Sequence, residues 1–135
     1  MSYGVAAALQ VAVFDRLRAD AALQALIGDA VHDAVPPGTP PGTYVLLGPE
    51  EVADRSDITG AGAEHRLKVA VISAAAGFQA AKEVAGVVSD ALCGATLPLA
   101  RGRVVGLWFE RAVADRVPRG GARRIALTFR VRVED

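Results

Sequence analysis

The stretch Arg123–Asp135, RRIALTFRVRVED, decides the fold that the sequence predicts. Its apolar residues occupy every second position: Ile125, Leu127, Phe129, Val131 and Val133. Such alternation is typical of a β-strand with one face on a hydrophobic core and the other on a polar surface. The polar row includes Arg124, Arg130 and Arg132, and a core does not explain why that row is so basic.

A second long strand precedes this one. Residues 104–117 alternate in polarity, with Leu107, Phe109 and Val113 on one face and Trp108, Glu110 and Ala112 on the other. The glycines of the segment between the two strands, PRGGA at 118–122, tolerate the positive φ angles of a tight turn. We therefore expect the two strands to form an antiparallel hairpin.

The earlier segments show helix and strand patterns in turn. Apolar residues recur every fourth position from Val5 to Leu17, which predicts an N-terminal helix. Asp20 is a suitable N-cap for a short second helix that ends at Gly28. Further strands are predicted at 31–35, 43–48 and 65–73, and a further helix at 77–93. The expected fold class is α+β, an antiparallel sheet of about four to five strands with an N-terminal helix and a second helix packed on one face.

The length and composition indicate a single domain over residues 1–135. A chain of 135 residues buries enough surface to fold alone, and its single cysteine, Cys93, suits a reducing compartment. The sequence shows no basic, apolar start of a secretory signal and no apolar run long enough to span a bilayer. We expect a cytoplasmic protein without a membrane partner.

The charges are unevenly distributed although the formal net charge is zero. Residues 1–100 hold six Lys/Arg and eleven Asp/Glu, a balance of −5, and residues 101–135 hold nine Arg and four acids, a balance of +5. The polar segment at 49–63, predicted to be a flexible loop, is acidic, whereas the C-terminal region is basic. We expect these two groups to form an interface between identical subunits: Glu50, Glu51, Asp54, Asp57, Arg123, Arg124, Arg130 and Arg132.

Catalytic and metal-binding motifs are absent from the sequence. His32 and His65 stand singly, without the spacing that metal ligation needs. Cys93 falls near the apolar face of a predicted helix, where a buried thiol acts as a small hydrophobe. The glycine-rich segments lack the context of a phosphate-binding loop. We therefore expect no catalytic residue, no metal and no cofactor.

The order of these elements resembles the tail terminator, or tail completion, proteins of long-tailed bacteriophages and phage-like gene transfer agents. The similar pieces span nearly the whole chain: ALQVAVFDRLRADAALQALIG, VHDAV, the proline-rich entry into TYVLLG, the polar segment, HRLKVAVISAAAGFQAAKEVAGVVSDAL, VVGLWFERAVADRV and GGARRIALTFRVRVE. Thr43 and Ile72 depart from the residues that such proteins often place before the following Tyr44 and Ser73.

The resemblance implies a structural virion protein without enzymatic activity. It implies a homohexameric ring that caps the head-proximal end of the tail tube, stops tube polymerisation and joins the tail to the head connector. Its partners would be the major tail tube protein and the head-completion (stopper) protein, with double-stranded DNA only in transit through the lumen. It would lie in the host cytoplasm during assembly and at the head–tail junction of the particle afterwards.

Two other interpretations remain open at this stage. The chain could be a small α+β regulatory or ligand-binding module that shares this element order. The basic C-terminal region could be a solvated face, a contact with an acidic protein, or a nucleic-acid surface; the last normally brings a net basic domain with interleaved aromatics.

Overall fold

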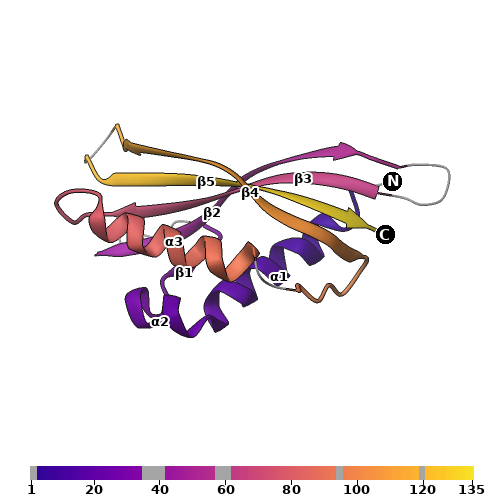
Figure 1. Cartoon of the computed structure of the whole chain (residues 1–135), viewed down its shortest axis with the longest axis horizontal. Helices are drawn as coiled ribbons and strands as arrows, with labels where there is room; N and C mark the ends of the chain where they lie inside the picture. The colour runs from indigo at the N-terminus through magenta and orange to yellow at the C-terminus, as the bar shows by residue number, and fades with distance from the viewer. Residues whose placement is uncertain (1–2, 35–41, 57–61, 94–95, 119–120) are drawn as a thin grey trace.

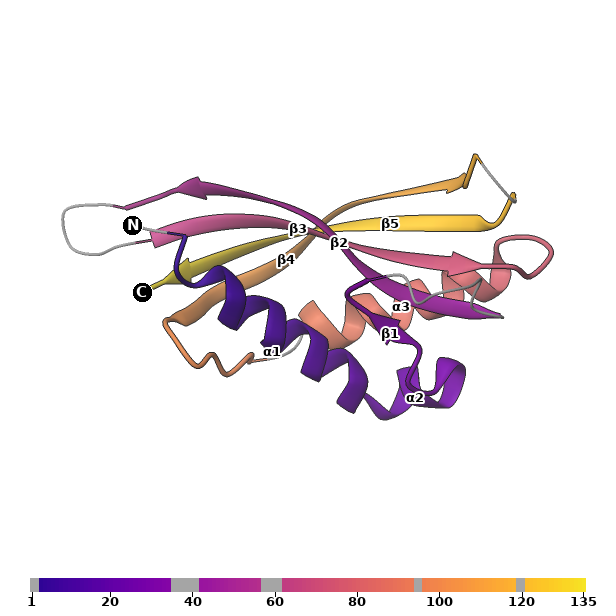
Figure 2. The same ribbon diagram turned by 180° about the vertical axis from the view of Figure 1, so that it is seen from behind.

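The fold is a five-stranded sheet with three helices on one face, seen in a computed structural model that describes residues 3–34, 42–56, 62–93, 96–118 and 121–135. The elements in chain order are α1 (Ala6–Ala19), α2 (Ala21–Ile27), β1 (Val31–His32), β2 (Thr43–Asp54), β3 (Gly62–Ser73), α3 (Gln79–Cys93), β4 (Arg103–Arg116) and β5 (Arg123–Glu134). All three helices lie on the same side of the sheet in both views (Figures 1 and 2). The α+β class with an N-terminal helix is confirmed.

The strand order β1-β2-β3-β5-β4 places the C-terminal strand inside the sheet and β4 at its edge. Strands β2, β3, β5 and β4 pair antiparallel along almost their whole lengths, including the predicted β4–β5 hairpin. The sheet is mixed rather than purely antiparallel, because the short β1 pairs parallel with Val45 and Leu46 of β2. No helix in the described ranges is long and apolar enough to cross a membrane.

The core lies between the helices and the inner face of the sheet, the face on the helix side. Phe129 of β5 is its largest fully buried side chain, and Leu9 and Leu17 of α1 pack in the same cluster. The predicted boundary between α1 and α2 is confirmed: Asp20 adopts an extended conformation, and its carboxylate accepts a hydrogen bond of 3.0 Å from the backbone N–H of Leu23. Gly28 then ends α2 with a φ of 62°.

The predicted loop at 49–63 is shorter than the sequence suggests. Strand β2 continues through Asp54 and β3 begins at Gly62, so residues 50–54, 62 and 63 of the polar segment pair in the sheet. The register shifts by one residue between Leu47 and Glu50, and this β-bulge breaks the two-residue period that marks a strand in the sequence. Residues 57–61 lie outside the described ranges, and flexibility there stays a prediction.

Two further bulges lie in β4 and change which of its side chains share a face. The register shifts between Val104 and Gly106 and again between Phe109 and Arg111. Beyond the second shift, Ala112 pairs with the inward-facing Leu127, and Val113 pairs with Ala126 on the other face. The predicted grouping of Val113 with Leu107 and Phe109 is therefore wrong, because a bulge inserts one residue and inverts the alternation that follows.

Candidate functional site

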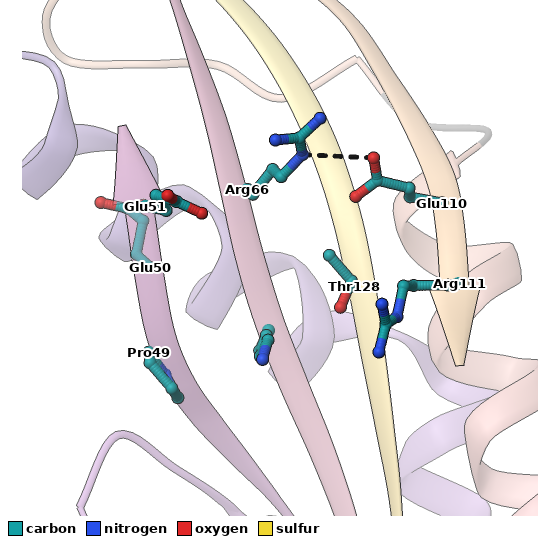
Figure 3. Close-up of a pocket in the computed structure, with 8 residues that line it drawn as sticks. Pro49, Glu50, Glu51, Arg66, Glu110, Arg111 and Thr128 are labelled. Carbon is teal, nitrogen blue, oxygen red and sulfur yellow. Dashed lines mark hydrogen bonds and ion pairs between the residues drawn. The ribbon is translucent and has the colours of Figure 1, made fainter. Parts of the chain in front are cut away.

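The outer face of the sheet, which points away from the helices, carries a shallow charged hollow of about 470 Å³ (Figure 3). Its walls come from β2, β3, β4 and β5: Pro49, Glu50, Glu51, Arg66, Lys68, Glu110, Arg111 and Thr128. The guanidinium of Arg66 reaches over β5 to Glu110, with Nε donating to Oε1 at 3.2 Å. The hollow offers charges of both signs within a few ångströms, which suits a charged protein surface.

Lys68 and Arg111 are the cations of this hollow that remain available to a partner. Both side chains are exposed, and neither has a hydrogen bond or ion pair within the described part of the chain. Thr128 lies beside Arg111 in the register of β4 and β5 and is buried, so it adds little polarity to the floor. Neither cation was predicted as a site residue, because the sequence does not encode locally that β3 and β4 lie on either side of β5.

The basic row of β5 is largely neutralised within the chain. Arg124 makes two hydrogen bonds of 2.9 and 2.8 Å to the carboxylate of Asp115, the facing residue of β4. The hydrogen bonds from Arg124 hold the pKa of Asp115 below its ordinary value and raise the pKa of the arginine. Because β5 is flanked by β3 and β4 on its two sides, acids of both neighbours reach its arginines.

The other two arginines of the row are also engaged. Arg130 lies 3.9 Å from a carboxylate oxygen of Glu64, and its guanidinium carbon is 5.0 Å from the ring centroid of Trp108. Arg132 donates a hydrogen bond of 2.8 Å to the backbone carbonyl of Arg55. The outer face is therefore a mixed-charge surface rather than the basic stripe that the strand pattern suggests.

Arg123 does not belong to this face. It lies two residues before the inward-facing Ile125 and therefore points to the same face of the sheet. Its guanidinium donates a hydrogen bond to the carbonyl oxygen of Ala75 at 3.2 Å. It also lies over the ring of Phe78 at 5.7 Å. Arg123 thus closes the end of the core beside α3, away from the other candidate interface arginines.

The neighbouring acids Glu50 and Glu51 of β2 point to opposite faces of the sheet, because successive side chains of a strand alternate. Glu50 pairs in register with the inward-facing Leu67, and its Oε2 lies 3.2 Å from Nδ1 of His65, whose ring is 1% exposed. The alignment of these atoms is not that of a hydrogen bond. Tyr3 donates a long hydrogen bond of 3.5 Å to the other oxygen of Glu50. Glu50 is thus partly engaged on the helix side.

Glu51 and Asp54 remain as exposed acids of this segment. Glu51 pairs in register with Arg66 on the outer face. Hydrogen bonds from the hydroxyl and backbone N–H of Ser56, 2.7 and 3.1 Å long, hold the pKa of Asp54 below its ordinary value. Asp57 lies outside the described residues. The seven described residues of the eight predicted from charge therefore do not form one cluster.

The isolated histidines and the cysteine occupy separate places. His65 is buried in β3, and His32 is partly buried on β1. Cys93 is exposed at the end of α3, so the expectation of a buried thiol is wrong. Among the described residues, no group of three or more His, Cys, Asp or Glu is placed to hold a metal ion.

Two comparisons with known proteins agree with the resemblance found in the sequence. The model of a family described as "Tail completion protein gp17" matches residues 11–134. A solved chain from the "Virion of native gene transfer agent (GTA) particle" is 63% identical, covers 99% of this chain and 100% of its own length, and superposes with a TM-score of 0.93. No curated protein matches the chain significantly.

Proposed function

The chain belongs to the tail completion protein gp17 family and is a structural protein of a phage-type tail, and we propose that it forms the hexameric ring that ends the tail tube. In this proposal the ring caps the head-proximal end of the tube, stops its polymerisation and joins the tail to the head connector. The observation that supports it most is the 0.93 TM-score, at 63% identity, to a chain of a gene transfer agent virion.

The proposed partners are further copies of the chain, the major tail tube protein and the stopper protein of the connector. DNA passes through the lumen without a dedicated binding site, and the chain works at the head–tail junction after assembly in the host cytoplasm. A protein with this task needs neither catalysis nor a cofactor. The mixed-charge outer face fits protein partners better than nucleic acid, because Arg124, Arg130 and Arg132 already contact groups of their own chain.

Removal of the gene from a strain that produces the particles tests the proposal. Tails of uncontrolled length, and heads that stay unjoined to tails, are expected in electron micrographs, and the wild-type gene supplied in trans restores both. Tails of normal length joined to heads in the deletion strain would rule the proposal out. Tight binding of a small molecule, without association with tail tubes, would favour the ligand-binding alternative.

The charged residues of the outer face are proposed to contact a neighbouring subunit or the tube. An Arg130→Glu/Arg132→Glu double variant disturbs groups that have partners in the chain, whereas Lys68→Glu reverses a cation that has no partner among the described residues. We expect Lys68→Glu to weaken assembly, and the wild-type assembly to weaken as salt rises, because exposed charges are screened beyond about 8 Å at physiological ionic strength. Unchanged assembly of both variants would remove this face from the interface.

A further inference from the structure

Strand β4 exposes large apolar side chains at the edge of the sheet. Trp108 and Val113 lie on the outer face and are 46% and 42% exposed. Phe109 is 42% exposed but pairs with Phe129 on the inner face, so it does not belong with them. The strand is 14 residues long, and β5 is its strand neighbour on one side only. Exposed edge strands favour association with another chain. We call Trp108 and Val113 the β4 row.

Trp108 is the larger residue of this row and is held in place. A Cβ on Gly106 would lie 2.4 Å from atoms of the indole ring, so the ring lies directly against the glycine backbone. The guanidinium of Arg130 is 5.0 Å from the indole centroid. A tryptophan that is fixed on one side and open on the other loses little conformational entropy on binding, which is the property of an interface anchor.

Helix α1 offers an apolar groove of about 670 Å³ in the other layer of the molecule. Its inner face packs on the core, yet Ala7, Ala8 and Val11 of its outer face are also apolar, and Val11 is 59% exposed. Leu97 and Pro98, from the segment that follows α3, form the opposite wall. A helix that is apolar on both sides is normally covered on both sides. We call this hollow the α1 groove.

Beside each of the two surfaces, one charged side chain has no hydrogen bond or ion pair within the described part of the chain, and the others are paired. In the groove, Arg101 is bound by the carboxylate of Asp135, and Arg16 donates to a backbone carbonyl at 3.0 Å. Beside the β4 row, Glu110 is paired with Arg66.

Within the described ranges this leaves Asp15 at the groove and Arg111 at the row without a hydrogen bond or ion pair. The two remaining charges have opposite signs, so the surfaces are complementary in charge as well as in polarity.

We infer that the β4 row of one subunit seats in the α1 groove of the next copy of the chain. Trp108 lies on the outer face of the sheet and the groove lies in the helix layer, so the two surfaces of a single chain do not meet. A contact between unlike surfaces is head-to-tail, and such contacts form rings when the rotation closes. The inference rests on the proposed ring and assigns the contact between its subunits.

Cross-linking tests the contact directly. In a Cys93→Ser background, which removes the exposed native thiol, Asp15→Cys and Arg111→Cys are combined in one chain and treated with a short bis-maleimide. At about 0.5 mM protein, contacts with a Kd as weak as about 1 mM are still trapped. We expect a ladder of dimers and higher species, and a matched chain with Lys82→Cys in place of Asp15→Cys to give none. A ladder absent from the test chain, or equal in both, would overturn the inference.

Mixing two surface variants provides the second test. Trp108→Ser removes the anchor, and Ala7→Glu/Val11→Asp fills the groove with charge; each alone is expected to weaken self-association by about 30-fold or more. Mixed, they should form a 1:1 dimer that grows no further, because one intact row meets one intact groove. Sedimentation that shows no such dimer, or wild-type association in either variant, would refute the contact. If the variants still end tails at normal length, the inference fails and the proposed function stands.

Discussion

Truncation of Phe129 should cost far more stability than truncation of Phe109, although the two rings face each other across β4 and β5. Their centroids are 6.1 Å apart in an edge-to-face arrangement. Phe129 is 0% exposed and Phe109 is 42% exposed. A phenylalanine that buries about 200 Å², at about 25 cal/mol per Å², contributes about 5 kcal/mol, and the compactness of real unfolded chains makes this an upper figure.

For Phe129→Ala we therefore expect a loss of about 3–5 kcal/mol in the free energy of unfolding, in line with buried phenylalanines in general. Phe109→Ala removes little more than half of that buried area and should cost about 2 kcal/mol. Urea unfolding of the free chain measures both, and the double variant should show a coupling of about 0.5–1.5 kcal/mol. Should Phe129→Ala fail to fold, Phe129→Leu and Phe109→Leu give the same order at smaller cost. An equal loss at the two sites would refute the assignment of β5 to the interior and β4 to the edge.

Three other changes test local features. Asp20→Ala should cost about 1 kcal/mol in unfolding free energy through loss of the α2 N-cap, and Asp20→Asn much less. Gly102→Ala should destabilise the fold in thermal scans, because φ is +72° and the new Cβ would lie 2.5 Å from the carbonyl of Glu134, whereas Gly86→Ala, with open space around it, should not. Arg124→Met should raise the pKa of Asp115 toward its ordinary value in a carboxyl NMR titration. Because the pairing lowers the pKa of Asp115, it stabilises the fold at pH values above the pKa of this carboxyl in the unfolded chain, and this contribution is lost as the pH falls through the pKa in the folded chain. The wild type should therefore lose its advantage in unfolding free energy over the variant in acid. An unchanged Asp115 titration would contradict the pairing.

The sequence by itself determined the order of the elements and the face of the last strand, β5, that is buried. The alternation in Arg123–Glu134 and the four-residue spacing in α1 are local patterns, and burial of one face is enough to produce them. The cap at Asp20 and the positive φ at Gly28 also depend only on nearby backbone. These features, with the element order, were sufficient for the resemblance to tail completion proteins.

Only the tertiary structure decided what the basic row of the last strand faces and where the apolar surface lies. Strand order places β5 between β3 and β4, so Glu64 and Asp115 reach its arginines, and no local pattern encodes which strands are neighbours. The second bulge in β4 brings Trp108 and Val113 to one face although they are an odd number of positions apart. A β-bulge exists where one strand has one residue more than the partner strand beside it. The face on which the following side chains lie therefore depends on the partner strand, which is another part of the chain.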